Sequence, residues 1–155
     1  MRKVPLGTTI AYGMPGLGAG YMYLLMSLYV MKFSTDVLLI APAVMGVIFS
    51  ISRIWDAVSD PIAGYLSDRT TFKFGRRRTW ILISFIPISF GFLAVFSPPE
   101  SMQGQSLDLW MMIAILSFYS AITLLNVPHM ALGAELSEDY HERTRLFGVR
   151  HIGFT

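Results

Sequence analysis

Three charged residues interrupt an otherwise apolar stretch of the chain, residues 38–66. Arg53, Asp56 and Asp60 are spaced at i, i+3 and i+7, which places them on one face of a helix. A charge near the centre of a membrane costs about 3 kcal/mol on insertion scales, so such residues usually face a bundle interior or an aqueous cavity and mark the path of an ion or substrate. The spacing therefore predicts part of a transporter.

The two carboxylates have the chemistry of a cation site. Asp56 and Asp60 lie one helical turn apart, and Arg53 can neutralise only one of them. Sodium prefers oxygen ligands, and a proton could instead settle on either carboxylate. Either cation would make this a coupling site. The alternative is a structural Arg–Asp cluster that ties the bundle together.

The composition favours a membrane protein. Of the 155 residues, 54% are apolar and only 14% are charged, whereas soluble domains carry about 25% charged residues. The net charge is only +2, and the clustering of the basic residues reflects membrane topology better than a nucleic-acid-binding surface. The absence of cysteine excludes a disulfide framework, a thiolate metal site and a cysteine nucleophile.

Hydropathy predicts four membrane spans, each near the ~20 residues that a bilayer requires: residues 10–31, 38–66, 80–96 and 109–132. The loop between the second and third spans carries Lys73 and four arginines, whereas the loop 97–108 has no lysine or arginine. The positive-inside rule then places both termini in the cytoplasm. We expect the chain in the plasma (inner) membrane. We expect residues 1–134 to form a four-helix transmembrane region.

The C-terminal part of the chain is polar at first and then apolar again. Seven of the eleven residues 135–145 are Glu, Asp, His or Arg, which predicts a cytoplasmic linker. Residues 147–155 are too few for a span, so we expect residues 135–155 to hold a linker and the truncated start of a fifth helix.

Two neighbouring motifs resemble those of a known transporter family. Residues 64–69 (GYLSDR) and 75–78 (GRRR) resemble the loop signature of the major facilitator superfamily between its second and third helices. Residues 53–61 (RIWDAVSDP) resemble the second helix of the glycoside-pentoside-hexuronide:cation symporter family, whose best-known member is melibiose permease. The resemblance implies an all-α membrane fold of twelve helices, of which this chain matches helices 1–4 and the start of helix 5.

The resemblance also implies a cation site. It maps this site onto Asp56, Ser59 and Asp60 in the second span and Thr123 in the fourth, all of which bear oxygen. Arg53 would be the charge partner of the carboxylates. The coupling ion would be sodium or a proton, and no other metal or cofactor is implied.

The sugar site matches the family less well. Gly20 stands where melibiose permease has an acidic residue, and Asn126 and Met130 stand where it has an aspartate and a stacking tryptophan. Arg150 alone matches a sugar-site position. Carboxylates commonly grip sugar hydroxyls, so these differences argue against a melibiose-like galactoside. Another glycoside, a pentoside, an anionic sugar or a lipid-like solute remains compatible.

The loop motif resembles a cytoplasmic gate, in which a carboxylate at a helix terminus and basic residues pair with neighbouring helices in the outward-facing state. We expect Asp68 to be the conformational residue. The arginine run alone would also satisfy the positive-inside rule, whatever the function. The motif residues are Gly64, Asp68, Arg69, Gly75, Arg76, Arg77 and Arg78.

One residue of the fourth span invites a further hypothesis. His129 follows Pro128 and could relay protons, although a histidine beside a helix kink is more often hydrogen-bonded. An enzyme is not expected, because the sequence has no nucleotide-binding loop and no supported Ser-His-Asp arrangement.

Together these features predict the N-terminal part of a sugar or glycoside symporter that is driven by sodium or protons and works by alternating access. Its partners would be a small-molecule sugar, membrane lipid and further helices of the same protein, without nucleic acid. Two alternatives stay open. One is a self-contained four-helix protein that transports as an oligomer, and the other is a membrane interaction module that does not transport.

Overall fold

The computed structural model describes residues 4–71, 75–136 and 139–154, with side chains as far as residue 151. Lys73 of the predicted basic loop lies outside these residues. The described part of the chain is all-helical, without strands. Its elements are α1 (Leu6–Lys32), the π-helical turn η1 (Phe33–Val37), α2 (Pro42–Arg69), α3 (Arg76–Phe96), α4 (Gln105–Leu136) and α5 (Tyr140–Phe154).

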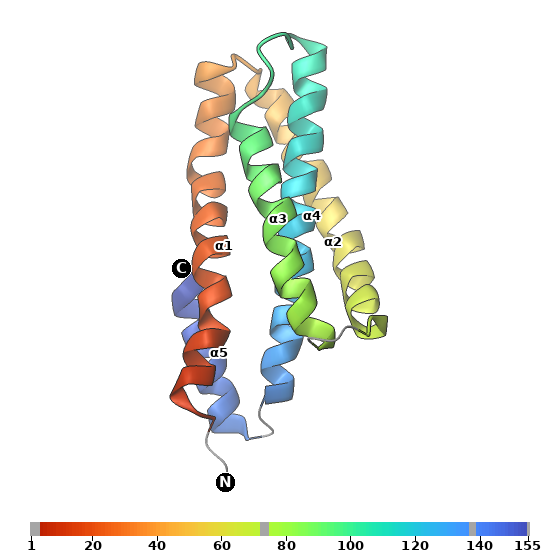
Figure 1. Ribbon diagram of the computed structural model, residues 1–155. Coiled ribbons are helices and arrows are strands. Elements are labelled where there is room, and N and C mark those ends of the chain that lie inside the picture. The colour runs from red at the N-terminus through yellow and green to blue at the C-terminus, as the bar shows by residue number, and fades with distance from the viewer. Residues whose placement is uncertain (1–3, 72–74, 137–138, 155) are drawn as a thin grey trace.

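The helices form an elongated bundle (Figure 1). Helices α1 to α4 run along its length, and α5 packs against the N-terminal half of α1. The N-terminal ends of α1, α3 and α5 lie at one end of the bundle, which we call the basic end because α3 begins there with three arginines. Successive long helices therefore run in opposite directions, which agrees with the predicted up-and-down path of the chain.

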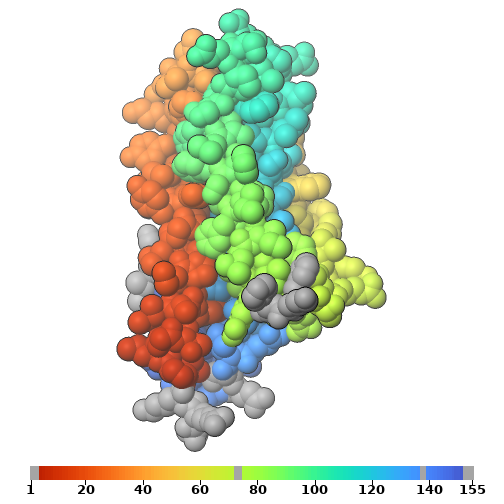
Figure 2. Space-filling view, in the orientation of Figure 1, coloured from red at the N-terminus to blue at the C-terminus, as the bar shows by residue number. Residues whose placement is uncertain are grey.

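The surface of the bundle is apolar to a degree that suits lipid. Among the described helices, α3 and α4 are the two that are long and apolar enough to cross a membrane. Arg53, Asp56 and Asp60 lower the hydropathy of α2. Large apolar side chains are nevertheless exposed along α1 and α3, which lie side by side in Figure 2. Soluble monomers rarely expose such continuous apolar surfaces, and these include Leu6, Ile10, Met14, Leu17, Leu28, Leu82, Ile86, Phe90 and Leu93.

Helix α4 forms the centre of the core. Its buried residues Ile115, Phe118 and Leu125 pack in one cluster with residues from α1, α2 and α3. The contact with α3 is close because of Gly91, where an added Cβ would lie 2.9 Å from the Cα of Phe118. A larger residue there would push the two helices apart, since packed cores have little free space.

The second helix begins later than hydropathy predicted. The apolar stretch starts at residue 38, but α2 starts at Pro42. Proline is favoured at the first position of a helix, because it lacks the N–H that would be unpaired there anyway. Leu39 has a positive φ of 55° and separates α2 from η1. Hydropathy does not detect such a break, because every residue around it is apolar.

The fifth helix begins earlier than predicted. Residues 135–145 were expected to be a linker, yet the described residues on both sides of 137–138 are largely helical, and α5 starts at Tyr140. Asp139 caps this start, because its Oδ1 accepts a hydrogen bond from the backbone N–H of His141 at 2.8 Å. Leu146 is fully buried in a small cluster against α1. A helix with one buried apolar face tolerates charges elsewhere, which is why composition suggested a linker.

Candidate functional site

The predicted cation-site residues of α2 lie together in the middle of the helix. Arg53 Nη1 lies 3.6 Å from Asp56 Oδ2, so the structure places the predicted charge partner beside this carboxylate. The other oxygen of Asp56, Oδ1, is buried and has no hydrogen-bond partner among the described residues. The hydroxyl of Ser59 donates to the backbone carbonyl of Asp56 at 3.3 Å, which leaves its lone pairs available. Asp60 is exposed and takes part in no ion pair of the described chain.

The fourth predicted residue of this site, Thr123, is buried in α4. Helices α2 and α4 pack against each other, and the indole Nε1 of Trp55 donates to the Ser120 hydroxyl at 2.7 Å. Thr123 therefore lies about one turn from a direct α2–α4 contact. No hydrogen bond between described residues joins Thr123 to the α2 carboxylates.

Aromatic residues surround the arginine of this site, which the sequence did not reveal. The guanidinium of Arg53 lies 5.7 Å from the ring centroid of Tyr119 on α4. Tyr23 of α1 meets Tyr119 edge to face, with 6.1 Å between ring centroids. A cation over an aromatic face is attracted by the ring electrons, so Arg53 has an alternative partner to Asp56. Residues 53–61 carry no signal for this, because the rings belong to α1 and α4.

Two of the predicted sugar-site residues are in direct contact. The Nη2 of Arg150 donates to the Oδ1 of Asn126 at 2.9 Å, which joins α5 to α4. The Nε of Arg150 donates to the Nδ1 of His129 at 3.4 Å. The other two predicted residues differ in their setting, because Gly20 is buried in α1 whereas Met130 is 52% exposed.

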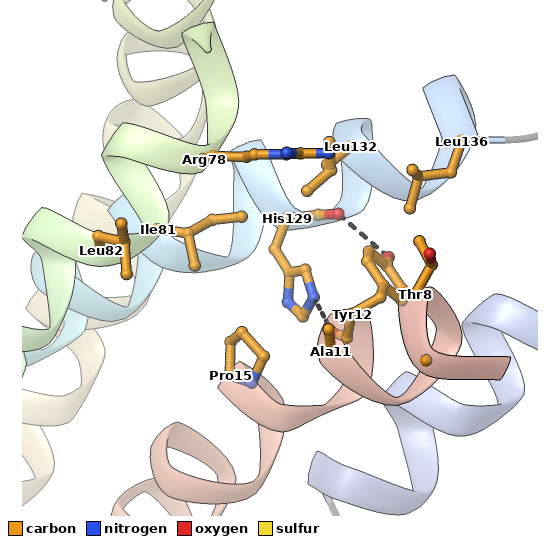
Figure 3. A pocket seen from close by; sticks show the side chains of 11 residues that line it. Thr8, Ala11, Tyr12, Pro15, Arg78, Ile81, Leu82, His129, Leu132 and Leu136 are labelled. Atoms are coloured by element: carbon orange, nitrogen blue, oxygen red, sulfur yellow. Dashed lines mark hydrogen bonds between the residues drawn. The ribbon is translucent and has the colours of Figure 1, made fainter. Parts of the chain in front are cut away.

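A separate cavity of ≈ 490 Å³ lies between α1, α3 and α4. Its wall is mainly apolar, and neither Asn126 nor Arg150 contributes to it. We therefore distinguish it from the predicted sugar site. Figure 3 shows Arg78 extended along one edge and the His129 ring between Pro15 and Tyr12. The lining is completed by Gly7, Thr8, Ala11, Ile81, Leu82, Leu132 and Leu136.

The gate motif forms an ionic cluster at the basic end. The Arg77 guanidinium bridges two helices, with Nη2 3.2 Å from Asp68 Oδ1 and Nε 2.9 Å from Glu135 Oε1. Arg76 Nη2 lies 2.8 Å from the same Glu135 oxygen. Arg76 also donates to the backbone carbonyl of Asp68 at 3.3 Å. The ends of α2, α3 and α4 are thus tied together.

Glu135 is a member of this cluster that the sequence analysis assigned to the linker. It is the second-last residue of α4. The sequence did hold a signal for this pairing. Glu135 follows the predicted end of a span, on the same membrane surface as the basic loop. It was missed because Glu135 opens a charged run.

The remaining motif residues have local roles. Gly64 faces α4, where an added Cβ would be in ordinary contact with Val127 at 3.6 Å. Gly75 precedes α3 with φ +99°, a conformation that side chains disfavour. Arg69 contacts only its own helix in the interactions described, where it hydrogen-bonds the Tyr65 hydroxyl and lies 4.7 Å from the centroid of that ring.

Comparison with known proteins now decides the family. The model of the MFS/sugar transport protein family matches residues 11–155. The chain belongs to this family. The resemblance found in residues 53–61 and in the loop motif is therefore confirmed.

This MFS/sugar transport chain is similar to several curated symporters. The uncharacterized symporter sll1374 of Synechocystis sp. is 35% identical over 153 residues, which are 96% of this chain and 28% of that protein. The inner membrane symporter YicJ of Escherichia coli is 33% identical over 92% of this chain and 31% of its own length. The sodium-dependent lysophosphatidylcholine symporter 1-A of Danio rerio is 34% identical over 72% of this chain and 21% of its own length.

Membership of the MFS/sugar transport family makes the chain part of a membrane transport protein rather than an enzyme. The all-helical bundle and its exposed apolar faces agree with this. The chain spans about a third or less of the length of these relatives. It therefore corresponds to a segment of such a symporter.

Proposed function

We propose that this chain supplies the first helices of a cation-coupled symporter for a sugar or glycoside, and that the middle of α2 is its cation site. The buried, unpartnered Oδ1 of Asp56 carries this proposal. A buried carboxylate oxygen without a donor is costly, and native structures rarely keep one without a reason. A sodium ion or a proton at this oxygen would remove the cost.

The charges around Asp56 support the same proposal. Asp56 and Asp60 supply two negative charges on one face of α2, and Arg53 supplies one positive charge, 3.6 Å from Asp56. One monovalent cation balances the remaining charge. The hydroxyl of Ser59 lies between the two carboxylates in sequence, and Thr123 would complete an oxygen-rich set if α4 closed onto α2.

For the substrate, we propose contact with Asn126 and Arg150. These two side chains hold donors and acceptors that match sugar hydroxyls, and the family is one of sugar transport proteins. By the family resemblance, Gly20 replaces the acidic residue of melibiose permease, so another glycoside, a pentoside or an anionic sugar suits the site better than a melibiose-like galactoside.

The ionic cluster of Asp68, Arg76, Arg77 and Glu135 would act as the cytoplasmic gate. It ties three helices at the basic end, and breaking it would favour the inward-facing state. In this proposal α1 to α4 span the plasma (inner) membrane and the basic end faces the cytoplasm, as the positive-inside rule requires. Alternating access would then need helices beyond this segment.

Uptake into right-side-out membrane vesicles tests the proposal, with the protein expressed from its complete gene. Labelled methyl glucoside, methyl xyloside and methyl glucuronide are offered with a sodium gradient, a pH gradient or neither. We expect one of these sugars to accumulate under one of the gradients. Asp60→Asn should abolish the stimulation, whereas Glu100→Gln, which changes an exposed carboxylate between α3 and α4, should not.

Two results would overturn parts of the proposal. Uptake that stays cation-stimulated in Asp60→Asn would remove the cation site from α2. Uptake of lysophosphatidylcholine, the solute named for the relative from Danio rerio, without uptake of any sugar would remove the sugar assignment.

A further inference from the structure

One buried polar side chain of α4 belongs to neither the cation site nor the gate. His129 is 1% exposed, and each of its ring nitrogens contacts a different helix. Its Nε2 lies 2.7 Å from the backbone carbonyl oxygen of Tyr12 on α1. Its Nδ1 lies 3.4 Å from the Nε of Arg150 on α5. A single side chain thus links three helices.

The partners of His129 fix the position of its proton. A carbonyl oxygen can only accept, so Nε2 must carry the hydrogen that Tyr12 receives. A guanidinium can only donate, so Nδ1 must be bare to receive the hydrogen of Arg150. Both contacts exist together only in the neutral ring with hydrogen on Nε2. The hydrogen-bond pattern therefore specifies one tautomer and one ring orientation.

Tyr12 holds the His129 ring from the other side. The Tyr12 hydroxyl donates to the backbone carbonyl of His129 at 3.1 Å, and the two ring centroids are 4.5 Å apart. Figure 3 shows the reciprocal hydrogen bonds, with Pro15 beyond the ring. A buried ring with two hydrogen bonds and an aromatic neighbour cannot turn without breaking contacts.

Two glycines bring the three helices close enough for this link. An added Cβ on Gly13 would lie 2.8 Å from Val149 Cγ1, so α1 and α5 touch next to Arg150. An added Cβ on Gly133 would overlap the Tyr12 hydroxyl, so α1 and α4 touch one turn beyond His129. These close approaches leave the His129 ring as the spacer between α1 and Arg150.

We propose that His129 is a positioning residue, which holds the Arg150 guanidinium against Asn126 so that the pair is preorganised for substrate. The Nδ1 acceptor and the Oδ1 of Asn126 bind different nitrogens of the planar guanidinium, so loss of Nδ1 would loosen its orientation. Preorganisation lowers the entropy that binding must overcome. The inference rests on the proposed function in so far as Arg150 and Asn126 contact the substrate.

Solid-state nuclear magnetic resonance tests the link without any substrate. The protein, expressed from its complete gene with ¹⁵N-labelled histidine, is placed in lipid bilayers, and the His129 signals are identified by their loss in His129→Gln. We expect hydrogen on Nε2 and none on Nδ1. Arg150→Leu should shift the Nδ1 resonance, whereas Arg145→Leu, which changes an exposed arginine of the same helix, should leave it in place. Hydrogen on Nδ1, or an Nδ1 signal indifferent to Arg150→Leu, overturns the proposal.

Uptake kinetics test the consequence for binding, with whichever of the three labelled sugars the unmodified protein accumulates. His129→Leu should raise the KM about tenfold and leave Vmax within about twofold, because the acceptor that orients Arg150 is lost. His129→Gln keeps one donor and one acceptor and should restore most of the affinity. A KM unchanged in His129→Leu, or a His129→Gln variant as impaired as His129→Leu, overturns the proposal.

The two experiments also separate this inference from the proposed function. If the unmodified protein takes up none of the sugars, the proposed function fails while the resonance experiment still decides the role of His129. If His129→Leu does not reach the membrane, the His129→Gln kinetics and the resonance of the unmodified protein decide it.

Discussion

Helix α2 carries charged residues in its middle and at its C-terminal end, and the two groups differ in their partners. In the middle, one ion pair of 3.6 Å joins Arg53 to Asp56, and both residues belong to the same helix. At the end, Asp68 is paired with Arg77, which also bonds Glu135 of α4. The residue types are alike, yet among the described residues only the terminal group forms ion pairs between helices.

The difference indicates what each group does. The Glu135 oxygen at the basic end receives two arginine donors, so this cluster is electrostatically complete as it stands. The buried Asp56 oxygen receives none from the described residues. A complete cluster can open and close as a conformational lock, whereas an incomplete one needs a ligand. Substitutions in the two groups should therefore have different effects on uptake.

The largest effect is expected from Asp56→Asn. A neutral amide cannot balance a cation, so sugar uptake under a cation gradient should fall by about tenfold or more, the range of ordinary coupling energies. The measurement is initial uptake with and without the gradient in vesicles. Asp68→Asn is the matched control, and it should retain the stimulation while changing turnover. Equal losses of stimulation in the two variants would erase the distinction between the groups.

A smaller effect is expected from Arg77→Ala at the basic end. Arg77 holds two ion pairs, and exposed pairs are worth about 0.5 kcal/mol each, so the balance of outward- and inward-facing states should shift about fivefold. Vmax should change while the cation concentration for half-maximal uptake stays the same. The double variant Arg77→Ala with Glu135→Gln should change Vmax by less than the two single variants together. Full additivity would show that the two residues do not act as one lock.

In the middle of α2, Arg53→Gln should act in the opposite direction. It removes a positive charge 3.6 Å from Asp56, so the site should attract a cation about threefold more tightly, which is the size of effect expected for an ion pair with an exposed arginine. The measurement is the cation concentration for half-maximal uptake. A weaker cation affinity would mean that Arg53 shapes the site rather than opposes the cation.

The smallest effect is expected from Arg69→Gln. The described contacts of Arg69 are confined to Tyr65 on its own helix, so no helix pair is released. Exposed contacts of this kind contribute little, and Vmax should change by less than about twofold. A larger change in Vmax would mean that Arg69 also belongs to the conformational lock.

Much of the architecture could be predicted from the sequence. The helices and their order follow from hydropathy, and the spacing of Arg53, Asp56 and Asp60 identified the cluster on α2, because both signals are local in the chain. The start of α5 could not be predicted, since its charged residues conceal one buried face around Leu146.

Contacts between distant residues were harder to predict. Glu135 and Arg77 are 58 residues apart, and His129 and Tyr12 are 117 apart. Their pairing depends on how the helices pack and on close approaches at Gly13 and Gly133. Neither appears in a hydropathy or spacing pattern. The family resemblance supplied Asn126 and Arg150, but it gave no reason to include His129.

Infrared difference spectroscopy of the purified protein, expressed from its complete gene, would detect a cation at the α2 carboxylates. Adding sodium, or lowering the pH in its absence, should change the carboxylate bands when the cation reaches α2. We expect a band change that is lost in Asp56→Asn and Asp60→Asn and kept in Asp68→Asn. A difference spectrum that is the same in Asp56→Asn as in the unmodified protein would contradict it.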